Sequence, residues 1–190
     1  LYLFDETELT ACKREIEEEK QVAALVYIDN YEEALDSIED VKRSLLVALI
    51  DRRVNQYFYK MDGLVRKIEK DKYFVVFKYK YLEEMKDDKF RFLEETKAIK
   101  VGNEMAVTLS VGIGIKSDNY IENYECARAA IDLALGRGGD QVVIKEGDEI
   151  TYFGGKSKQV ESKNRVKARV KAQALQDIIE GCENVLIMGH

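Results

Sequence analysis

The residues of this chain with the clearest capacity for chemistry are four charged side chains at one predicted turn. Glu69, Lys70, Asp71 and Lys72 stand between two short runs rich in β-branched and aromatic residues, in the segment LVRKIEKDKYFVVF at residues 64–77. This pattern predicts a β-hairpin with a wholly polar tip. Such a tip is either a plain solvated turn or the place of a catalytic turn, and the hairpin alone leaves both interpretations open.

Several other kinds of catalytic site are excluded within these 190 residues. His190 is the only histidine, so no Ser-His-Asp, Cys-His or multi-histidine metal site can be assembled. The three cysteines, Cys12, Cys126 and Cys182, are odd in number and widely spaced. That spacing is typical of a protein in a reducing compartment, and of neither a disulfide framework nor a zinc site.

The composition is that of a globular domain, with 46% hydrophobic and 35% charged residues. The net charge of −6 is unevenly distributed, because residues 156–171 hold seven basic side chains and a single acid, Glu161. Clustered cations can bind nucleic acid or a membrane surface. The segment lacks the interleaved aromatic residues that would stack on bases, which favours an interdomain helix neutralised by the acidic remainder and no nucleic-acid partner.

The elements that position the charged turn follow from hydrophobic periodicity. The run VAALVYI at residues 22–28 predicts a central strand buried on both faces, and Asp29 and Asn30 follow it directly. We expect helices at 6–20, 31–38, 41–61, 81–99 and 121–135, and strands at 106–115, 141–145 and 149–153. In the helix at 41–61, a buried stripe is predicted from Leu45, Leu49, Val54 and Phe58.

The order of these elements predicts the fold class. The middle of the chain is a βαββαβ unit, so we expect an α+β domain with a ferredoxin-like core and an antiparallel sheet flanked by helices. In the strand at 106–115 one face carries Gly112 and Gly114, which would let another element approach closely. A basic helix at about 157–180 and a new apolar strand at 185–188 complete the expected elements.

Several segments resemble a known family. VTLSVGIGI, IDLALGRGG, IDNYEEALD and the charged hairpin together resemble a GGDEF domain, the fold of diguanylate cyclases, over residues 22–153. ALGRGGDQV, YFGGK, SKNRVKARVKAQAL and NVLIMGH, in this order, are similar to the GdpP type of cyclic di-AMP phosphodiesterase. That family joins a membrane anchor, a PAS domain, a degenerate GGDEF domain and a DHH phosphodiesterase domain, which hydrolyses cyclic di-AMP to pApA.

The resemblance implies a division of the chain. Residues 1–21 would be the end of a PAS domain and a connector helix, and 22–155 the degenerate GGDEF domain. Residues 156–183 would be a basic linker helix, and 184–190 the first strand of a truncated DHH domain. His190 would then be the first manganese ligand of that domain. The resemblance also implies a cytoplasmic domain of a cell-membrane protein.

The resemblance further implies a damaged cyclase site. A working cyclase holds two divalent cations with carboxylates and needs two glycines in the hairpin tip. Aligned on the first strand, the first metal-binding aspartate falls at Tyr27, whereas Asp29 matches the second acidic position. The guanine contacts fall at Leu35 and Ser44. The two glycines become Glu69 and Lys70, the following acid becomes Lys72, and the phenylalanine becomes Tyr73. Cyclic di-GMP synthesis is therefore not expected.

Asp71 keeps the metal-binding position, so the resemblance implies a weak ATPase with Asp71 as the catalytic and Mg²⁺-binding residue. Asp29, Asn30, Lys70, Lys72 and Arg137 would contact the ATP. A homodimer is expected, with the PAS and DHH domains as intramolecular partners. Two alternatives stay open: Asp29, Asp71 and the lysines are plain turn residues, and the domain is a ligand-free scaffold or dimerisation module. A phosphate loop at Gly154-Gly155-Lys156-Ser157 is disfavoured, because Ile150 stands where its first glycine is required.

Overall fold

The computed structural model describes residues 7–36, 38–115 and 119–154. The predicted basic helix, the predicted strand at 185–188 and His190 lie outside the described residues. Six strands form a single sheet in the order β2-β3-β1-β4-β5-β6. Their bounds are β1 Gln21–Ile28, β2 Leu64–Glu69, β3 Lys72–Lys78, β4 Leu109–Ile115, β5 Gln141–Glu146 and β6 Glu149–Gly154. All neighbours are antiparallel except β4 and β5, which run parallel.

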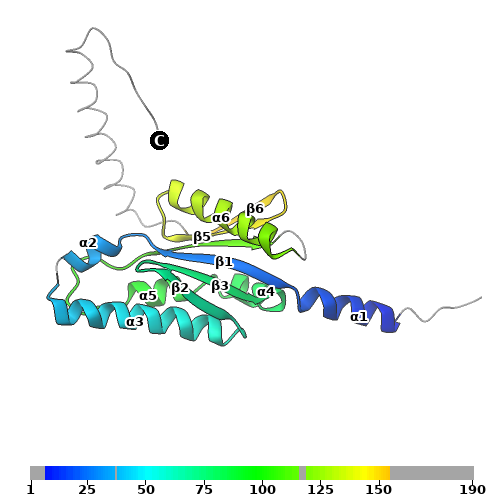
Figure 1. Cartoon of the computed structure of the whole chain (residues 1–190), viewed down its shortest axis with the longest axis horizontal. Helices are drawn as coiled ribbons and strands as arrows, with labels where there is room; N and C mark the ends of the chain where they lie inside the picture. Colours follow the sequence, from blue (N-terminus) through cyan, green and yellow to red (C-terminus); the bar gives the residue numbers. More distant parts are fainter. Residues whose placement is uncertain (1–6, 37, 116–118, 155–190) are drawn as a thin grey trace, which may run out of the picture. The chain divides into compact units, whose positions relative to one another are not determined.

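Helices cover the two faces of this sheet unequally. They are α1 Thr7–Glu18, α2 Tyr31–Asp36, α3 Asp40–Tyr59, α4 Leu82–Asp87, α5 Phe92–Lys97 and α6 Tyr120–Gly136, with a short 3-10 helix η1 at Tyr79–Tyr81. Figure 1 shows α3, α4 and α5 on one face and α6 on the other. The unit β1-α3-β2-β3-α4/α5-β4 is the predicted ferredoxin-like core, and α6, β5 and β6 extend it. The α+β prediction is therefore confirmed.

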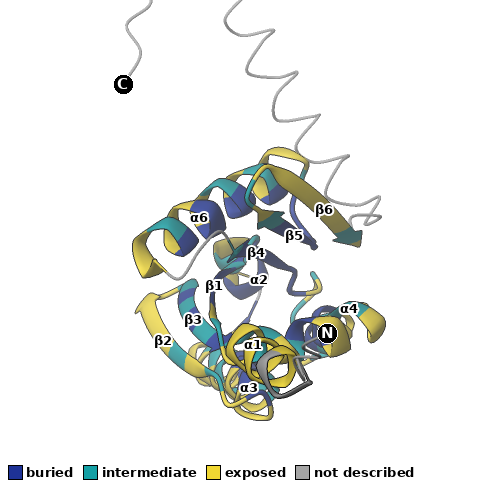
Figure 2. Ribbon diagram, turned by 90° about the vertical axis from the view of Figure 1, so that its right-hand side faces the viewer, coloured by how far each residue is buried: buried dark blue, intermediate teal, exposed yellow. Residues whose placement is uncertain are grey.

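The centre of the sheet is buried as its sequence predicts. Residues Val22–Val26 of β1 are between 0% and 6% exposed, because both faces of this strand are covered (Figure 2). In β3, by contrast, buried and half-buried residues alternate, with Tyr73, Val75 and Phe77 facing the core beneath α3. The larger core thus lies between the sheet and helices α3 to α5.

The first two members of the predicted buried stripe of α3 were wrong, each by one residue. Leu46, Ile50, Val54 and Phe58 are buried at a regular spacing of four, whereas Leu45 is 50% exposed. Leu49 is half-buried. The consecutive leucines at 45 and 46 allow either register, and stepping back from Phe58 in fours selects Leu46.

The predicted single helix at 81–99 is also wrong, because it is interrupted between α4 and α5. Lys89 and Phe90 have φ values of 55° and 54°, which end the helical path. This turn places the Phe90 ring in the core, where it is 1% exposed and lies 5.1 Å from the ring of Phe153. Burial of the aromatic ring offsets at least part of the cost of two left-handed residues.

Candidate functional site

The charged turn is confirmed as the tip of the hairpin that joins β2 to β3, with Lys70 and Asp71 between the strands. The tip is bonded to the end of the central strand. The Ile28 N–H donates a hydrogen bond to the Asp71 carbonyl oxygen at 2.9 Å, and Tyr27 pairs with Lys72 in the ladder. The backbone thus holds Asp71 next to the end of β1, where Asp29 follows.

Asp71 has an available carboxylate. It is half-buried, and within residues 7–36, 38–115 and 119–154 its side chain makes no hydrogen bond or ion pair. A carboxylate with open coordination sites, beside two lysines, is chemically suited to a cation that is shared with phosphate oxygens. This is the feature of the tip that most favours a ligand.

The two lysines of the tip already have acidic partners. The Lys70 ammonium forms an ion pair with Glu32 at the start of α2 and lies 5.5 Å from the centre of the Tyr31 ring. The Lys72 ammonium pairs with Glu69 at 2.8 Å. Hydrogen bonding to these carboxylates raises the pKa of both lysines. A phosphate would have to displace Glu32 and Glu69, although exposure to water keeps both pairs weak.

Asp29 acts as an anchor for the glycine-rich turn after α6. Its Oδ2 accepts a hydrogen bond from the Asp140 backbone N–H at 2.8 Å. Gly139 has φ +77°, and a Cβ there would lie 2.7 Å from the Asp29 Cγ, so only glycine fits this approach. Burial raises the pKa of the Asp29 carboxyl. One of its two oxygens is thus committed to the backbone of a distant loop.

The run Gly136-Arg137-Gly138-Gly139-Asp140 therefore has a structural explanation. The N–H groups of Gly138 and Gly139 donate to the carbonyls of Leu135 and Ala134 at 3.0 Å each, which closes the end of α6. The Asp140 carboxylate is 2% exposed and pairs with Lys97 of α5 at 2.7 Å. These bonds favour a helix exit over a phosphate cradle.

Asn30 and Arg137 are placed away from an open ligand position. Asn30 is 8% exposed, its Nδ2 donates to the Ala106 carbonyl at 2.8 Å, and its Oδ1 accepts from the Thr108 N–H at 3.0 Å. The Arg137 guanidinium lies 4.3 Å from the centre of the Tyr152 ring on β6, the edge strand opposite β2. The fold thus brings Asp29, Lys70, Asp71 and Lys72 to one end of the sheet, whereas Arg137 turns toward β6.

The residues at the lost cyclase positions have other roles. Tyr27 is half-buried beneath the Lys72 ammonium, which lies 5.4 Å from its ring centre, and burial raises its pKa. Leu35 is buried in the larger core. The Tyr73 hydroxyl donates to Asp51, which also pairs with Lys67 at 2.8 Å. In the part of the chain that is described, no three His, Cys, Asp or Glu residues could hold a metal ion together.

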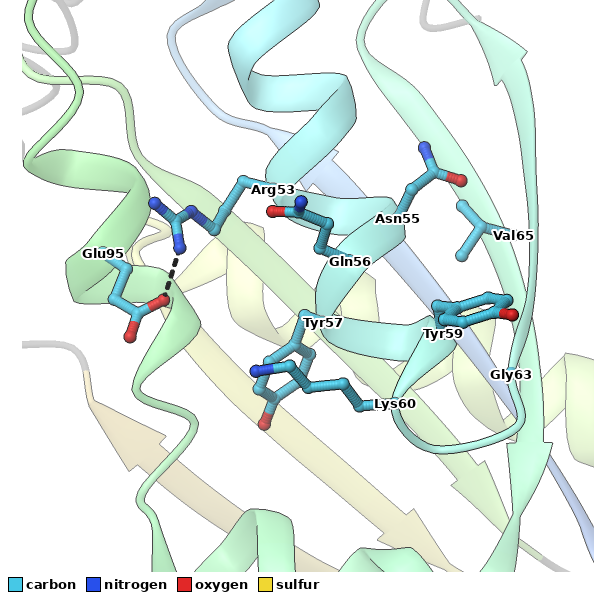
Figure 3. Close-up of a pocket in the computed structure, with 9 residues that line it drawn as sticks. All are labelled: Arg53, Asn55, Gln56, Tyr57, Tyr59, Lys60, Gly63, Val65 and Glu95. Carbon is cyan, nitrogen blue, oxygen red and sulfur yellow. Dashed lines mark hydrogen bonds and ion pairs between the residues drawn. The ribbon is translucent and has the colours of Figure 1, made fainter.

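A cavity of about 510 Å³ lies at the other end of β2. It is lined by Arg53, Asn55, Gln56, Tyr57, Tyr59, Lys60, Gly63, Val65 and Glu95. Figure 3 shows Arg53 reaching from α3 to Glu95 on α5, with 2.9 Å between nitrogen and oxygen. Glu95 is the only acid among these nine residues and it already neutralises Arg53. The cavity therefore lacks paired carboxylates for a metal, and none of the predicted site residues lines it.

Comparison with known proteins decides the family. The family model for the GGDEF domain of GdpP-like cyclic-di-AMP phosphodiesterases matches residues 26–152. The chain belongs to this family. It is 35% identical over 191 residues to the cyclic-di-AMP phosphodiesterase PdeA of Listeria monocytogenes and 34% identical to GdpP of Bacillus subtilis. All of the chain is covered in both comparisons, but it spans only 29% of each relative.

Solved structures confirm the GGDEF fold. A diguanylate cyclase/phosphodiesterase from Caldicellulosiruptor saccharolyticus superposes with a TM-score of 0.57 at 14% identity, over 76% of this chain and 87% of that one. The active GGEEF domain of a diguanylate cyclase from Vibrio cholerae gives 0.55 at 13% identity, over 73% and 89%. At these identities the likeness concerns the fold alone. Within the described ranges of this GGDEF domain, no helix has the length and apolar character to cross a bilayer.

Sequence reasoning missed several partners of the site. Glu32, which binds Lys70, is 38 residues away in the chain, and Lys97, which binds Asp140, lies on another helix. An acid in the first turn of a helix is a common feature that signals no specific contact. No sequence signal could have found these pairs.

Proposed function

We propose that this GGDEF domain is the regulatory, nucleotide-binding module of a membrane-anchored cyclic di-AMP phosphodiesterase and lies on the cytoplasmic side. The names of its relatives support cyclic-di-AMP phosphodiesterase activity for the whole protein. We propose pApA as the product of that hydrolysis. We place a PAS domain before residue 22 and a DHH domain from residue 184, where His190 would be a manganese ligand. The basic segment at 156–183 would transmit the state of the GGDEF domain to the DHH domain.

The single observation that supports nucleotide binding is the open carboxylate of Asp71, held at the end of β1 by the Ile28 hydrogen bond. Mg²⁺ usually keeps several waters and is bound by one or two carboxylates together with substrate phosphates. One carboxylate at the tip fits that requirement, whereas the two-cation site of a cyclase does not fit. Asp71 would hold one Mg²⁺, which neutralises charge on the phosphates of ATP, and Lys70 and Lys72 would bind phosphate oxygens.

Hydrolysis at such a site would be slow and weakly selective for the base. Leu35 is buried and the Ser44 hydroxyl donates to the Asp40 carbonyl at 3.2 Å, so neither is placed to distinguish guanine from adenine. Positioning and charge neutralisation would supply most of the rate. We therefore propose weak ATP hydrolysis in which water attacks the γ-phosphate without a strong base.

The test is calorimetric titration of the domain with ATP and GTP, with and without Mg²⁺. We expect Mg²⁺-dependent binding that Asp71→Ala weakens at least about tenfold, which corresponds to roughly 1.4 kcal/mol. Asp148→Ala is the matched control, because Asp148 is an exposed aspartate at the tip of the β5–β6 hairpin. In single-turnover assays, Asp71→Ala should hydrolyse ATP more slowly than the native domain, and Asp148→Ala should match the native domain. Equal binding by both variants would refute the assignment of Asp71.

A second candidate is a scaffold without a ligand, and the pairs around the tip favour it. Glu32 holds Lys70, Glu69 holds Lys72, and Asn30 is bonded to Ala106 and Thr108. If neither nucleotide binds at millimolar concentration, with or without Mg²⁺, the scaffold is the better description. The domain would then space or pair the flanking domains.

A further inference from the structure

Two adjoining hollows surround the last turns of α3. The cavity of about 510 Å³ at the start of β2 is joined by a second hollow of about 260 Å³ on the side of α4 and α5. Tyr57, Lys60 and Glu95 line both, so the two hollows meet at these residues. The second hollow is also lined by Met61, Glu84, Asp88, Arg91 and Phe92. We call the residues that line the two hollows the α3 groove. The larger hollow alone has the volume of a small-molecule site, roughly 300–1,000 Å³.

Tyr57 is the half-buried aromatic residue of the α3 groove. Its ring stacks on the Phe92 ring, with 4.2 Å between ring centres and 22° between ring planes. The Tyr57 hydroxyl oxygen is buried and has no hydrogen-bond partner within residues 7–36, 38–115 and 119–154. Most buried polar groups in folded proteins are hydrogen-bonded, so an unpaired hydroxyl in a hollow points to a ligand atom.

The charged residues of the α3 groove are balanced, with three cations and three acids. They are Arg53, Lys60 and Arg91, and Glu84, Asp88 and Glu95. Four of the six are held by one another. Arg53 pairs with Glu95 at 2.9 Å, and the Arg91 Nε lies 3.8 Å from the same carboxylate. The Asp88 Oδ1 accepts a hydrogen bond from the Arg91 backbone N–H at 2.8 Å.

Lys60 and Glu84 are the two charged residues of the groove that remain. Both are exposed, and neither side chain makes a hydrogen bond or an ion pair with another residue of the described ranges. Burial raises the pKa of the Tyr57 hydroxyl, and the nearby carboxylates of Asp88 and Glu84 raise it further. The hydroxyl therefore stays protonated. The groove thus presents one available cation, one available acid and one hydrogen-bond donor.

This set of groups discriminates between kinds of ligand. A polyphosphate would meet three carboxylates, and a polyamine would meet three cations. Within the described ranges no three acids are close enough to hold a metal ion. A molecule with one carboxylate and one ammonium group matches the available groups. Tyr59 and Val65, on the β2 side of the groove in Figure 3, add apolar surface.

We propose that the α3 groove binds a free amino acid with an apolar side chain. The Lys60 ammonium and the Tyr57 hydroxyl would bind the ligand carboxylate, and the Glu84 carboxylate would bind the ligand ammonium. The apolar side chain would extend into the larger hollow. The groove lies at the opposite end of β2 from the hairpin tip, so this binding does not depend on a nucleotide at Asp71.

Isothermal titration of the 190-residue chain with L-leucine and L-phenylalanine tests this proposal. We expect saturable binding of both. Isocaproate is leucine without its ammonium group, and isoamylamine is leucine without its carboxylate. Each should bind at least about tenfold more weakly than L-leucine. Absence of binding by either amino acid at millimolar concentration overturns the proposal, and so does an analogue that binds as tightly as L-leucine.

Two charge substitutions test the assigned roles. Glu84→Gln and Lys60→Met should each weaken the binding of L-leucine at least about tenfold. Glu83→Gln and Lys100→Met are the matched controls, because neither residue lines the groove and both are exposed. The controls should bind L-leucine as the native chain does. Equal losses in a variant and its control would overturn the roles of Lys60 and Glu84.

Tyr57→Phe separates ligand binding from a structural role, because it removes only the hydroxyl. Affinity for L-leucine should fall roughly fivefold, whereas the melting temperature without ligand should stay the same or rise, since an unpaired buried hydroxyl is lost. Unchanged affinity would overturn the contact between this hydroxyl and the ligand. A lower melting temperature would also overturn it, because the hydroxyl would then have a partner within the fold.

Discussion

Individual residues at and near the hairpin tip of this GGDEF domain form contacts within the fold at positions where a cyclase would bind its ligands. Tyr73 adds a hydroxyl to a core position, and Asp51 accepts its hydrogen bond. Asp29 remains an acid but bonds to the Asp140 N–H. Tyr73 and Asp29 thus each have a partner inside the fold, whereas the Asp71 carboxylate makes no hydrogen bond or ion pair within the described residues, and we assign it to a ligand.

Two substitutions of Asp29 should distinguish how its hydrogen bond and its charge each contribute to the free energy of unfolding. Asn at position 29 can still accept from the Asp140 N–H, so Asp29→Asn should keep the stability at neutral pH or raise it. Asp29→Ala loses the acceptor and leaves a buried N–H, which should cost about 1–3 kcal/mol of the free energy of unfolding. Urea unfolding of the three proteins measures both effects.

The native protein and Asp29→Asn should also differ in how their free energy of unfolding depends on pH. Burial raises the pKa of Asp29 in the folded state above its unfolded value, so the folded protein binds this proton more tightly. The stabilisation that comes from this bound proton is complete below the pKa of Asp29 in the unfolded state, and it is lost as the pH rises through the pKa in the folded state. The advantage of Asp29→Asn over the native protein should therefore grow over that range, and a shrinking advantage would contradict the assignment.

At the scale of elements, the contact between α6 and β4 depends on two glycines. A Cβ on Gly114 would lie 2.1 Å from the Asn123 carbonyl oxygen and 2.2 Å from the Ala127 nitrogen, and one on Gly112 would lie 2.3 Å from the Ile131 nitrogen. These atoms belong to helix backbone, which cannot move aside as a side chain can. The helix rests directly on the strand, and the predicted role of this small-residue face is confirmed.

Gly114→Ala should therefore force α6 away from the sheet. We expect a loss of about 3 kcal/mol or more in the free energy of unfolding, at the upper end of overpacking effects. Gly136→Ala is the control, because nothing lies within 4 Å of a Cβ at the end of α6. Thermal unfolding should show a large drop for the first variant and little change for the second. Similar melting temperatures would contradict the packing described for β4.

At the scale of the whole molecule, the sheet carries α3, α4 and α5 on one face and α6 on the other (Figure 1). The hairpin tip lies at the carboxyl end of β1, because the Ile28 N–H donates a hydrogen bond to the Asp71 carbonyl oxygen.

The whole domain should not synthesise cyclic di-GMP. The metal ligand, guanine contacts and tip glycines of a cyclase are replaced by Tyr27, Leu35, Ser44, Glu69 and Lys70, and together these changes remove its catalytic site. Residues 7–36, 38–115 and 119–154 contain no cluster of three metal-binding side chains. Incubation with GTP and Mg²⁺ or Mn²⁺, followed by chromatography, should show no cyclic dinucleotide. An active GGEEF domain serves as the positive control. Detectable product would contradict the degenerate site.

The sequence by itself determined the α+β core and the hairpin with its charged tip, because periodicity and turn residues are local properties. The family followed from the resemblance of its motifs. Only the tertiary structure decided which charged groups are free. Asp29 and the Asp140 N–H are 111 residues apart, and Lys70 and Glu32 are 38 apart. Their pairing depends on how strands and helices pack, which no local pattern encodes. The same reason explains the start of the α3 stripe and the break at Phe90, where burial in the core selected one of several locally acceptable conformations.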